Sequence, residues 1–417
     1  MDNFIRNWIG LFILGSINNL PYVIVVSAAK TIADSFDERN QVGLVVGANV
    51  ALSVVVKFGN TFFCLKTKYW IRYVLNAVIM LIGLFGVAYA FSFWFALVCI
   101  VFVGASAAFG ENVALGYLRL FPSTLVNAWS SGTGMAGVLG AGIYIIFGCV
   151  VGAGGENTEK LKSLTKYAFL LTTPFVVLYM ISYFFIIKPP RSEDEVEDVP
   201  PQSGNVQDSG EEGETGEDRR PLMHDAVSGD EQVFEAPAER LKTYEEPMCR
   251  KIFRCFKITS WLSFNLCAVY LFEYIVQGCA AKVRPKSEYN IGCPELYAAL
   301  SLCYQAGVFV SRSSVQLLRI QRVEVLTILQ GINMFIWLFD VHYKFMPTSI
   351  LPAVMIYVGL LGGASYVNIF YRLLHDDIYP DKDRELCINI VAIFITLGIV
   401  LGTVSETILF NTVLKSD

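Results

Sequence analysis

The chain is expected to be an all-α polytopic membrane protein with about eleven transmembrane helices. Its 417 residues are 54% hydrophobic, with a mean hydropathy of +0.51, which is too apolar for a soluble protein of this length. Separate apolar segments reach the roughly 20 residues that a bilayer crossing needs. A strongly acidic stretch, residues 188–239, divides these segments into two groups. These observations predict a helical membrane protein built from two halves.

The first half, residues 1–187, contains six predicted membrane helices. They are Phe4–Ala29, Val42–Cys64, Tyr73–Ala90, Trp94–Leu118, Ala128–Gly152 and Tyr167–Ile187. The first could be taken for a signal peptide, but it is too long for the apolar region of one, and Asn18, Asn19 and Pro21 interrupt it. We therefore assign it as the first membrane helix.

Residues 188–239 are expected to be a disordered loop. The stretch holds 16 acidic and 4 basic residues, a net charge of −12, whereas the rest of the chain carries +7. It is rich in Pro, Gly and Ser and lacks apolar periodicity, so it cannot bury enough apolar surface to fold. Most of it is interpreted as a solvated linker between the two halves.

Residues 240–257 are expected to form a basic amphipathic helix at the membrane surface. Arg250, Lys251, Arg254 and Lys257 alternate there with apolar side chains. Such a helix lies in the interface and is attracted to anionic headgroups. Membrane lipids are therefore expected partners of this segment.

The second half, residues 258–417, contains five predicted membrane helices. They are Ile258–Ala281, Leu296–Leu318, Val323–Tyr343, Thr348–Leu374 and Glu385–Leu414. Cys279 and Cys293 flank a polar loop between the first two of them. These cysteines could form a disulfide if the loop faces an oxidising lumen, or they could remain free thiols.

The basic residues beside the seventh membrane helix decide the predicted orientation. The short loops on the two sides carry nearly balanced numbers of Lys and Arg, so they do not decide it. Because cytosolic flanks are enriched in Lys and Arg, the basic residues at 250–257 place the N-terminus and the acidic loop in the cytosol. An odd number of crossings then leaves the C-terminus on the lumenal side.

Several ionisable and polar side chains fall inside predicted membrane helices. Such groups are costly in a bilayer and mark functional sites by default. The candidates for substrate binding are Lys57, Glu111, Glu273, Gln305 and Arg312. Arg312 follows Gln305 by two turns on one helical face, and its guanidinium group matches the geometry of a phosphate or a carboxylate.

Some of these candidates have a structural alternative. The stem of Lys57 could carry its amine to the cytosolic interface. Arg312 could form a structural ion pair with Glu111 or Glu273 instead of binding an anion. Glu111 cannot reach the interface as easily as a lysine, and it follows a run of small residues, so we expect it to be buried.

Two clusters of small residues, at 129–142 and 359–368, lie in the fifth and tenth predicted helices. Small side chains four residues apart let membrane helices pack closely, which is one interpretation. The other is an interrupted helix whose free N–H groups and hydroxyls bind an anion. On that interpretation Ser130, Ser131 and Thr133 would contact the substrate.

No motif for an ATP-driven pump or a hydrolase is present. The sequence lacks a Walker phosphate-binding loop, a nucleophile elbow and metal-ligand spacing, and its three histidines are scattered. We therefore expect no enzymatic activity, no cofactor or metal, and no nucleic-acid partner.

Several blocks of sequence, spread over both halves, carry a resemblance to a known family. They are Asn18–Val23 with Ser27–Ala29, Trp129–Gly134, Glu273–Tyr274 with Gln277–Gly278, Tyr304–Ser314 and Gly359–Asn368. Together they resemble the battenin family of lysosomal membrane proteins, which is linked to juvenile neuronal ceroid lipofuscinosis. The block around Arg312 is long and unusual enough to be specific.

The resemblance implies a two-half, major-facilitator-like transporter fold in the late endosomal or lysosomal membrane. It also implies roles in lysosomal pH homeostasis and in clearing glycerophosphodiesters, and basic amino acids are a second substrate class associated with the family. In that setting Asp218, followed by Leu222 and Met223, resembles an acidic dileucine sorting signal that clathrin adaptors recognise.

Two hypotheses for the function follow. In the first, the protein is a secondary carrier that moves glycerophosphodiesters or related small organic ions by alternating access. Arg312 would hold the phosphate, and Glu111 or Glu273 would face a cationic headgroup or carry a coupled proton. In the second, the protein is a non-transporting scaffold that recruits trafficking or acidification machinery through the acidic loop.

Overall fold

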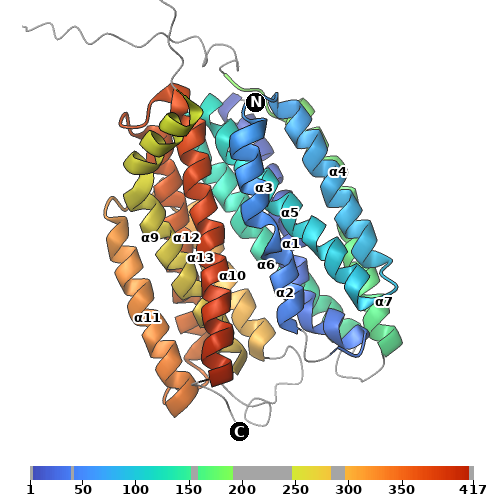
Figure 1. Ribbon diagram of the computed structural model, residues 1–417. Helices are drawn as coiled ribbons and strands as arrows, with labels where there is room; N and C mark the ends of the chain where they lie inside the picture. Colours follow the sequence, from blue (N-terminus) through green and yellow to red (C-terminus); the bar gives the residue numbers. More distant parts are fainter. Residues whose placement is uncertain (1–2, 39–41, 152–157, 191–246, 283–295, 413–417) are drawn as a thin grey trace, which may run out of the picture.

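The computed structural model describes residues 3–38, 42–151, 158–190, 247–282 and 296–412, and every regular element in these ranges is a helix. The long helices lie side by side in one bundle (Figure 1). The prediction of an all-α membrane fold is therefore confirmed.

The first half is built from six crossings. They are α1 (Asn3–Ser35), the consecutive helices α2 (Val42–Ala51) and α3 (Ser53–Gly59) with the π-helical turn η2 (Asn60–Cys64), α4 (Tyr69–Ala88), α5 (Phe93–Tyr117), α6 (Val126–Val151), and α7 (Thr158–Ile181) with its π-helical end η5 (Ser182–Ile186). Two single 3₁₀ turns, η3 (Leu118–Leu120) and η4 (Ser123–Leu125), join α5 to α6.

The second half is built from five crossings. They are α9 (Met248–Lys282), α10 (Leu296–Ser313), α11 (Val323–Tyr343), α12 (Leu351–His375) and α13 (Arg384–Thr412), which follows the 3₁₀ turn η7 (Asp381–Asp383). The bounds of α11 agree with the predicted span, because the apolar run there ends abruptly on both sides.

Nine helices in the described part of the chain are long and apolar enough to cross a membrane by length and composition alone. The other two expected crossings are α6 and α10, which pack against each other. The start of α6, residues 126–134, is buried throughout, so its small and polar residues face other helices rather than lipid. In membranes, such small residues allow close helix contact.

The second crossing is broken, which the sequence did not predict. α2 ends at Ala51, α3 begins at Ser53, and a π-helical turn replaces the α-helix from Asn60 onward. Breaks in a membrane helix persist only where neighbouring groups or a cavity satisfy the freed backbone. Here the Asn112 amide donates a 3.3 Å hydrogen bond to the carbonyl oxygen of Lys57.

The two glycine-rich helices, α6 and α12, are continuous, so the interpretation of interrupted helices is wrong. Their glycines serve close packing. A Cβ atom on Gly359 would lie 2.1 Å from the carbonyl oxygen of Tyr304, and a Cβ atom on Gly132 would lie 2.2 Å from that of Phe12. Side chains at these positions would push α12 from α10 and α6 from α1.

The predicted interfacial helix is not separate from the seventh crossing. Residues 248–257 form the first turns of α9, which runs unbroken to Lys282, whereas residues 240–246 lie outside the described chain. No Pro or Gly occurs between Met248 and Lys257, so nothing ends the helix before it enters the apolar region.

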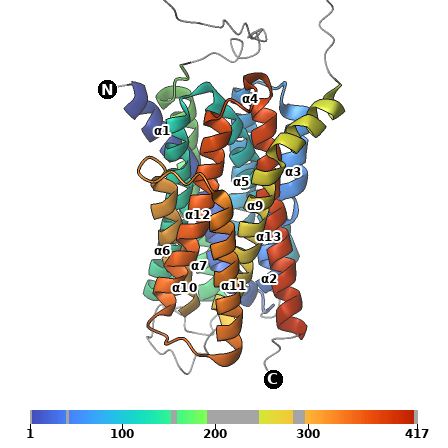
Figure 2. The same cartoon turned by 90° about the vertical axis from the view of Figure 1, so that its left-hand side faces the viewer.

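The 35 residues of α9 span about 52 Å at a rise of about 1.5 Å per residue, whereas the hydrocarbon core is about 30 Å thick. Figure 2 shows its first turns leaning away from the neighbouring helices. There the Lys251 and Arg254 side chains lie 2.6 and 2.7 Å from the carboxylate oxygens of Asp383. These ion pairs fix the start of α9 to the beginning of α13.

The two halves form two groups of helices (Figure 1). Helices α1–α7 pack mainly with one another, as do α9–α13, and the groups meet where α6 contacts α10 and where α5 and α3 contact α13. α1 and α13 begin at the same end of the bundle, and α13 ends at the opposite one. The junction of the two groups is where the polar residues gather.

Candidate functional site

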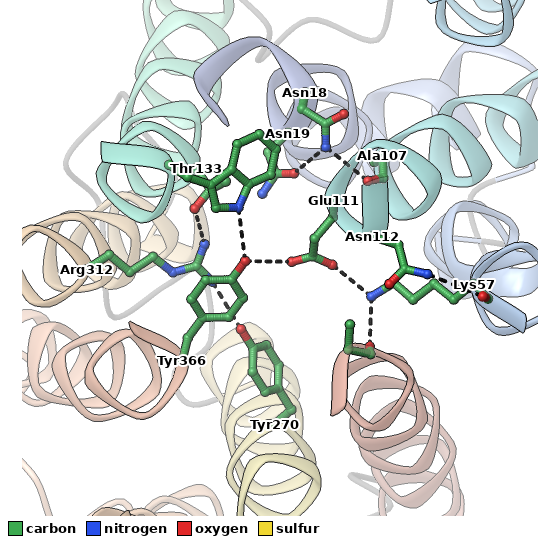
Figure 3. Close-up of polar contacts among 12 residues, drawn as sticks. Asn18, Asn19, Lys57, Ala107, Glu111, Asn112, Thr133, Tyr270, Arg312 and Tyr366 are labelled. Carbon is green, nitrogen blue, oxygen red and sulfur yellow. Dashed lines mark hydrogen bonds and ion pairs between the residues drawn. The ribbon is translucent and has the colours of Figure 1, made fainter. Parts of the chain in front are cut away.

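Lys57 and Glu111 form an ion pair at the junction of the halves (Figure 3). Lys57 Nζ lies 2.7 Å from Glu111 Oε2, and it donates a 2.9 Å hydrogen bond to the carbonyl oxygen of Ala392 on α13. The Lys57 side chain is only 1% exposed. The alternative in which its amine reaches the interface is therefore wrong, because α5 and α13 cover α3.

Glu111 is also joined to the second half through Tyr366 of α12. The Tyr366 hydroxyl donates a 3.1 Å hydrogen bond to Glu111 Oε1 and accepts one from Trp129 Nε1 at 3.3 Å. The Tyr366 and Trp129 side chains are fully buried. This carboxylate therefore contacts both halves at once.

Arg312, near the end of α10, is held by neutral groups. Its Nη1 donates to the Thr133 hydroxyl at 2.6 Å, and its Nη2 donates to the Tyr270 hydroxyl at 3.0 Å. The guanidinium carbon lies 4.1 Å from the centre of the Tyr366 ring, a favourable cation–π distance. The Nε atom is buried and has no hydrogen-bond partner.

The structural alternative for Arg312 is not found in the described residues. It forms no ion pair with Glu111, which pairs with Lys57, or with Glu273, which accepts a hydrogen bond from Tyr304. A buried guanidinium without a carboxylate keeps its full charge available, and its planar fork suits a phosphate or carboxylate oxygen pair.

A cavity of about 130 Å³ lies beside these groups. The residues predicted from the sequence that line it are Lys57, Glu111, Thr133, Gln305 and Arg312. The tyrosines that line it are Tyr22, Tyr270, Tyr274 and Tyr304. These side chains come from α1, α3, α5 and α6 of the first half and from α9 and α10 of the second. The cavity therefore offers two cations, one carboxylate and several hydroxyls, and the two halves share it.

Three other residues predicted to bind substrate are buried but do not line the cavity. They are Ser130, Ser131 and Glu273. The two serine hydroxyls have no partner in the described chain, and Thr133 one turn later on α6 is the residue that reaches Arg312. Glu273 is separated from the cavity by Tyr304, whose hydroxyl donates to it.

A second buried cluster lies two turns from Ala392 along α13, and we call it the Glu385 cluster. Arg72 Nη1 lies 2.8 Å from Glu385 Oε1, Arg119 Nη2 lies 3.4 Å from Oε2, and the Tyr69 hydroxyl donates to Oε2 at 2.6 Å. Both arginines lie just outside the predicted membrane helices Tyr73–Ala90 and Trp94–Leu118, yet Arg72 is only 1% exposed. Its burial is tolerated because the carboxylate from the other half offsets the charge.

Sequence reasoning missed the aromatic partners of the charged residues. Tyr366 lies inside the small-residue cluster 359–368, and Tyr270 precedes Glu273 by one turn. A signal was present in both cases, since each tyrosine lies beside a residue or cluster already singled out. The hydrogen bonds themselves join residues far apart in the chain, and no local pattern reveals them.

Several predicted features lie outside the described residues. Asp218, Leu222 and Met223 of the sorting signal are among them, and so is Cys293. Cys279 is buried in α9. The sorting signal and the disulfide therefore stay predictions.

Two solved structures share the arrangement of helices. The proton:xylose symporter XylE, bound to 6-bromo-6-deoxy-D-glucose, superposes with a TM-score of 0.62 at 11% identity, covering 98% of this chain and 89% of that one. The E. coli fucose:proton symporter FucP gives 0.58 at 13% identity, covering 98% and 93%. Identities this low show the fold alone. With a shared cavity between its halves, the chain has the fold of a major facilitator transporter.

The chain belongs to the CLN3 protein family, which it matches over residues 9–415. Battenin of Dictyostelium discoideum is 37% identical over 99% of this chain and 96% of its own length. Battenin of Canis lupus familiaris is 27% identical over 95% and 89%, and protein BTN1 of Saccharomyces cerevisiae is 27% identical over 94% and 91%. The resemblance to the battenin family is confirmed, and the protein is transporter-like in family and fold.

Proposed function

We propose that this protein is a secondary carrier of the lysosomal membrane that moves small organic phosphates, above all glycerophosphodiesters, by alternating access. The observation that carries the proposal is the buried Arg312 guanidinium, which lines a cavity between the two halves and has no carboxylate partner among the described residues. An isolated buried charge is costly, so an anionic substrate is the partner that this site lacks.

The phosphate end of the substrate would bind at Arg312. The unpaired Nε and the two Nη groups can present parallel N–H donors to two phosphate oxygens. The Thr133 and Tyr270 hydroxyls already hold the guanidinium plane in place. Since the group is preorganised, less rotational freedom is lost when the anion binds.

The other end of the substrate would lie near Glu111. This carboxylate lines the cavity, and a cationic headgroup could share it with Lys57. A basic amino acid has the same two features, a carboxylate for Arg312 and a cationic side chain for Glu111. The proposal therefore includes basic amino acids as a second substrate class, with a proton as the coupling ion.

The Glu385 cluster supports an alternating-access mechanism. It joins α4 and η3 of the first half to α13 of the second and closes one end of the junction. Rocking of the halves would separate Glu385 from both arginines and open that end. The polar contacts of Arg312 and Tyr366 across the junction would exchange during the same movement.

The lysosomal location is supported by family membership and by the predicted sorting signal from Asp218 to Met223. Clathrin adaptors would recognise this signal in the cytosolic loop. The N-terminus would then be cytosolic and the C-terminus lumenal. Export of charged or proton-coupled products from the lumen would also connect the carrier to lysosomal pH homeostasis.

Uptake of labelled glycerophosphocholine into proteoliposomes tests the role of Arg312. We expect Arg312→Ala to lower uptake at low substrate concentration by about 10- to 100-fold, the loss expected for a hydrogen-bonded ion pair. Arg312→Lys keeps the positive charge but lacks the planar guanidinium, so its uptake should lie between those of Arg312→Ala and wild type. Arg319→Ala, in the exposed loop after α10, is the control and should match wild type. Equal uptake by Arg312→Ala and wild type would contradict the assigned role.

The scaffold hypothesis makes the opposite prediction for the acidic loop. A carrier that lacks residues 192–239 but is redirected to lysosomes should still clear glycerophosphodiesters, whereas a scaffold should not. The cavity favours the carrier, because a scaffold has no use for a buried, unmatched guanidinium between two halves.

A further inference from the structure

Glu273 of α9 is a buried carboxyl group that forms no ion pair within the described part of the chain. It is 1% exposed. The Tyr304 hydroxyl donates a hydrogen bond to its Oε1, while its Oε2 has no partner and lies against Gly362 of α12, where a Cβ atom would be 2.2 Å away. The carboxyl group is therefore tightly packed between α9, α10 and α12.

The other buried carboxyl groups of the described chain are neutralised or stabilised locally. Glu385 faces Arg72 and Arg119, and Asp383 faces Lys251 and Arg254. Asp340 accepts a 2.7 Å hydrogen bond from the backbone N–H of Met346 at a helix end. Glu273 has neither kind of partner, and a buried carboxylate without a cation costs far more than a carboxylic acid does.

The ionisable groups around Glu273 come from several helices. They are Tyr270 and Tyr274 on α9 itself, Tyr304 and Arg312 on α10, and Tyr22 on α1. Glu111 on α5 is near two of these tyrosines, Tyr22 and Tyr270. On α13, Glu406 faces Gly278, more than a turn further along α9. α12 contributes Gly362, and α11 meets α9 through a hydrogen bond between Thr327 and Asn265. Arg312 is the charged side chain that acts electrostatically on Glu273. Its guanidinium group is already hydrogen-bonded to the Thr133 and Tyr270 hydroxyls.

Glu273 does not touch the cavity, but Tyr304 does. Tyr304 lines the cavity and bonds to Glu273 from the other side. A substrate in the cavity therefore meets Glu111 and not Glu273, so a cationic headgroup cannot be its missing partner. A proton is small enough to reach it through the tyrosine.

We propose that Glu273 is the protonation site of the carrier and that Tyr304 connects it to the cavity. The proposal rests on the carrier function proposed above. It divides the two carboxyl groups by role: Glu111 faces the substrate and stays paired with Lys57, whereas Glu273 takes up and releases the coupled proton.

The proton step involves no other reactant than cavity water. The O–H bond of Tyr304 breaks as a new O–H bond forms on Glu273 Oε1, and the tyrosine oxygen takes a proton from a hydronium ion in the cavity. The net change is one proton moved from the cavity to the carboxylate, which becomes neutral, while Tyr304 ends as it began. Release is the reverse step, after the cavity has opened to the less acidic side.

Infrared difference spectroscopy on the purified full-length protein tests the site without any substrate. Acidification of wild type should produce the C=O stretch of a protonated carboxyl group. We expect Glu273→Gln to lose this band, while Glu406→Gln, which removes a carboxyl group on α13 that does not line the cavity, should keep it. If Glu273→Gln folds well and its infrared band is unchanged, the proposal is overturned.

Transport gives the second test. With one proton per substrate, a gradient of about one pH unit should let wild type accumulate glycerophosphocholine about tenfold on the less acidic side. Glu273→Gln should lose this accumulation and keep exchange of labelled for unlabelled substrate at equal pH. Tyr304→Phe should accumulate more slowly, because the connecting hydroxyl is gone.

The two tests separate the two proposals. A wild type that does not transport glycerophosphocholine would count against the proposed function, and the infrared band would still decide whether Glu273 is the protonation site. If Glu273→Gln loses both exchange and accumulation but keeps the infrared band, Glu273 has a structural role instead.

Discussion

Lys57 and Glu111 show how an ion pair can be both a structural and a functional element. Lys57 is fully buried, and Glu111 is the carboxylate that lines the cavity. Each charge makes the burial of the other tolerable. A cationic substrate group at Glu111 would share the carboxylate with Lys57, which also donates to the carbonyl oxygen of Ala392.

A double-mutant cycle separates these two roles. Lys57→Met or Glu111→Gln alone leaves an unmatched group and should destabilise the protein by about 3–5 kcal/mol. The double variant should regain most of that loss and still fail to transport. Thermal unfolding of the detergent-solubilised protein measures the first effect, and proteoliposome uptake the second. Additive losses of stability would show that the two side chains do not act as a pair.

At the scale of the element, glycines decide how closely α10 and α12 approach. A Cβ atom on Gly359 would meet the carbonyl oxygen of Tyr304, and one on Gly307 would lie 2.2 Å from that of Ile356. Tyr304 and Arg312 both stand on α10, so the spacing of these helices also places Tyr304 against Glu273. The close packing thus supports the site without contacting the substrate.

Gly359→Ala should lower stability by about 1–3 kcal/mol, the usual cost of overpacking a buried contact. The backbone carbonyl that it meets cannot move aside as a flexible side chain would. Gly142→Ala in α6 is the matched control, since its Cβ would meet nothing within 4 Å. Thermal unfolding of the two variants provides the comparison, and equal unfolding temperatures would contradict the packing argument.

At the scale of the whole molecule, the Glu385 cluster ties the first half to the second through Arg72, Arg119 and Tyr69. Asn389 of α13 lies one turn after Glu385 and one turn before Ala392, whose carbonyl oxygen accepts from Lys57. It is buried, and neither side-chain atom has a partner among the described residues. An open cluster would hydrate this position first. In the proposed alternating-access cycle, the intact cluster would belong to the state that is closed at this end.

Removal of the Glu385 charge should shift the molecule toward the state open at that end. The probe is a cysteine introduced by Asn389→Cys in a background without native cysteines, and it is labelled with a membrane-impermeant maleimide. We expect labelling to be at least about tenfold faster when Glu385→Gln is added. A tenfold change corresponds to a shift of about 1.4 kcal/mol in the equilibrium. The reagent must be applied from the side of the acidic loop. Unchanged labelling would show that the cluster stabilises the fold without controlling access.

Much of the fold was predictable because the requirement for a membrane helix is local. An apolar run such as Val323–Tyr343 has the composition of a span wherever it lies in the chain. The prediction failed at α9, where polar turns continue the helix beyond the apolar region. It also failed at the π-helical turn after Gly59, because an α5 side chain, Asn112, satisfies the nearby carbonyl oxygen of Lys57 and no local pattern indicates this contact.

The sequence by itself determined which side chains are chemically out of place in a membrane, Arg312, Lys57, Glu111 and Glu273 among them. Their cost depends only on the residue type and on its apolar neighbours in the chain. The tertiary structure alone decided which partners surround each of them and which of them line the cavity. Partners such as Lys57 and Glu111 are 54 residues apart, and only packing shows that Glu111 faces the cavity while Glu273 lies behind Tyr304. Burial and partners together, rather than residue type, support the proposed division between a substrate contact and a protonation site.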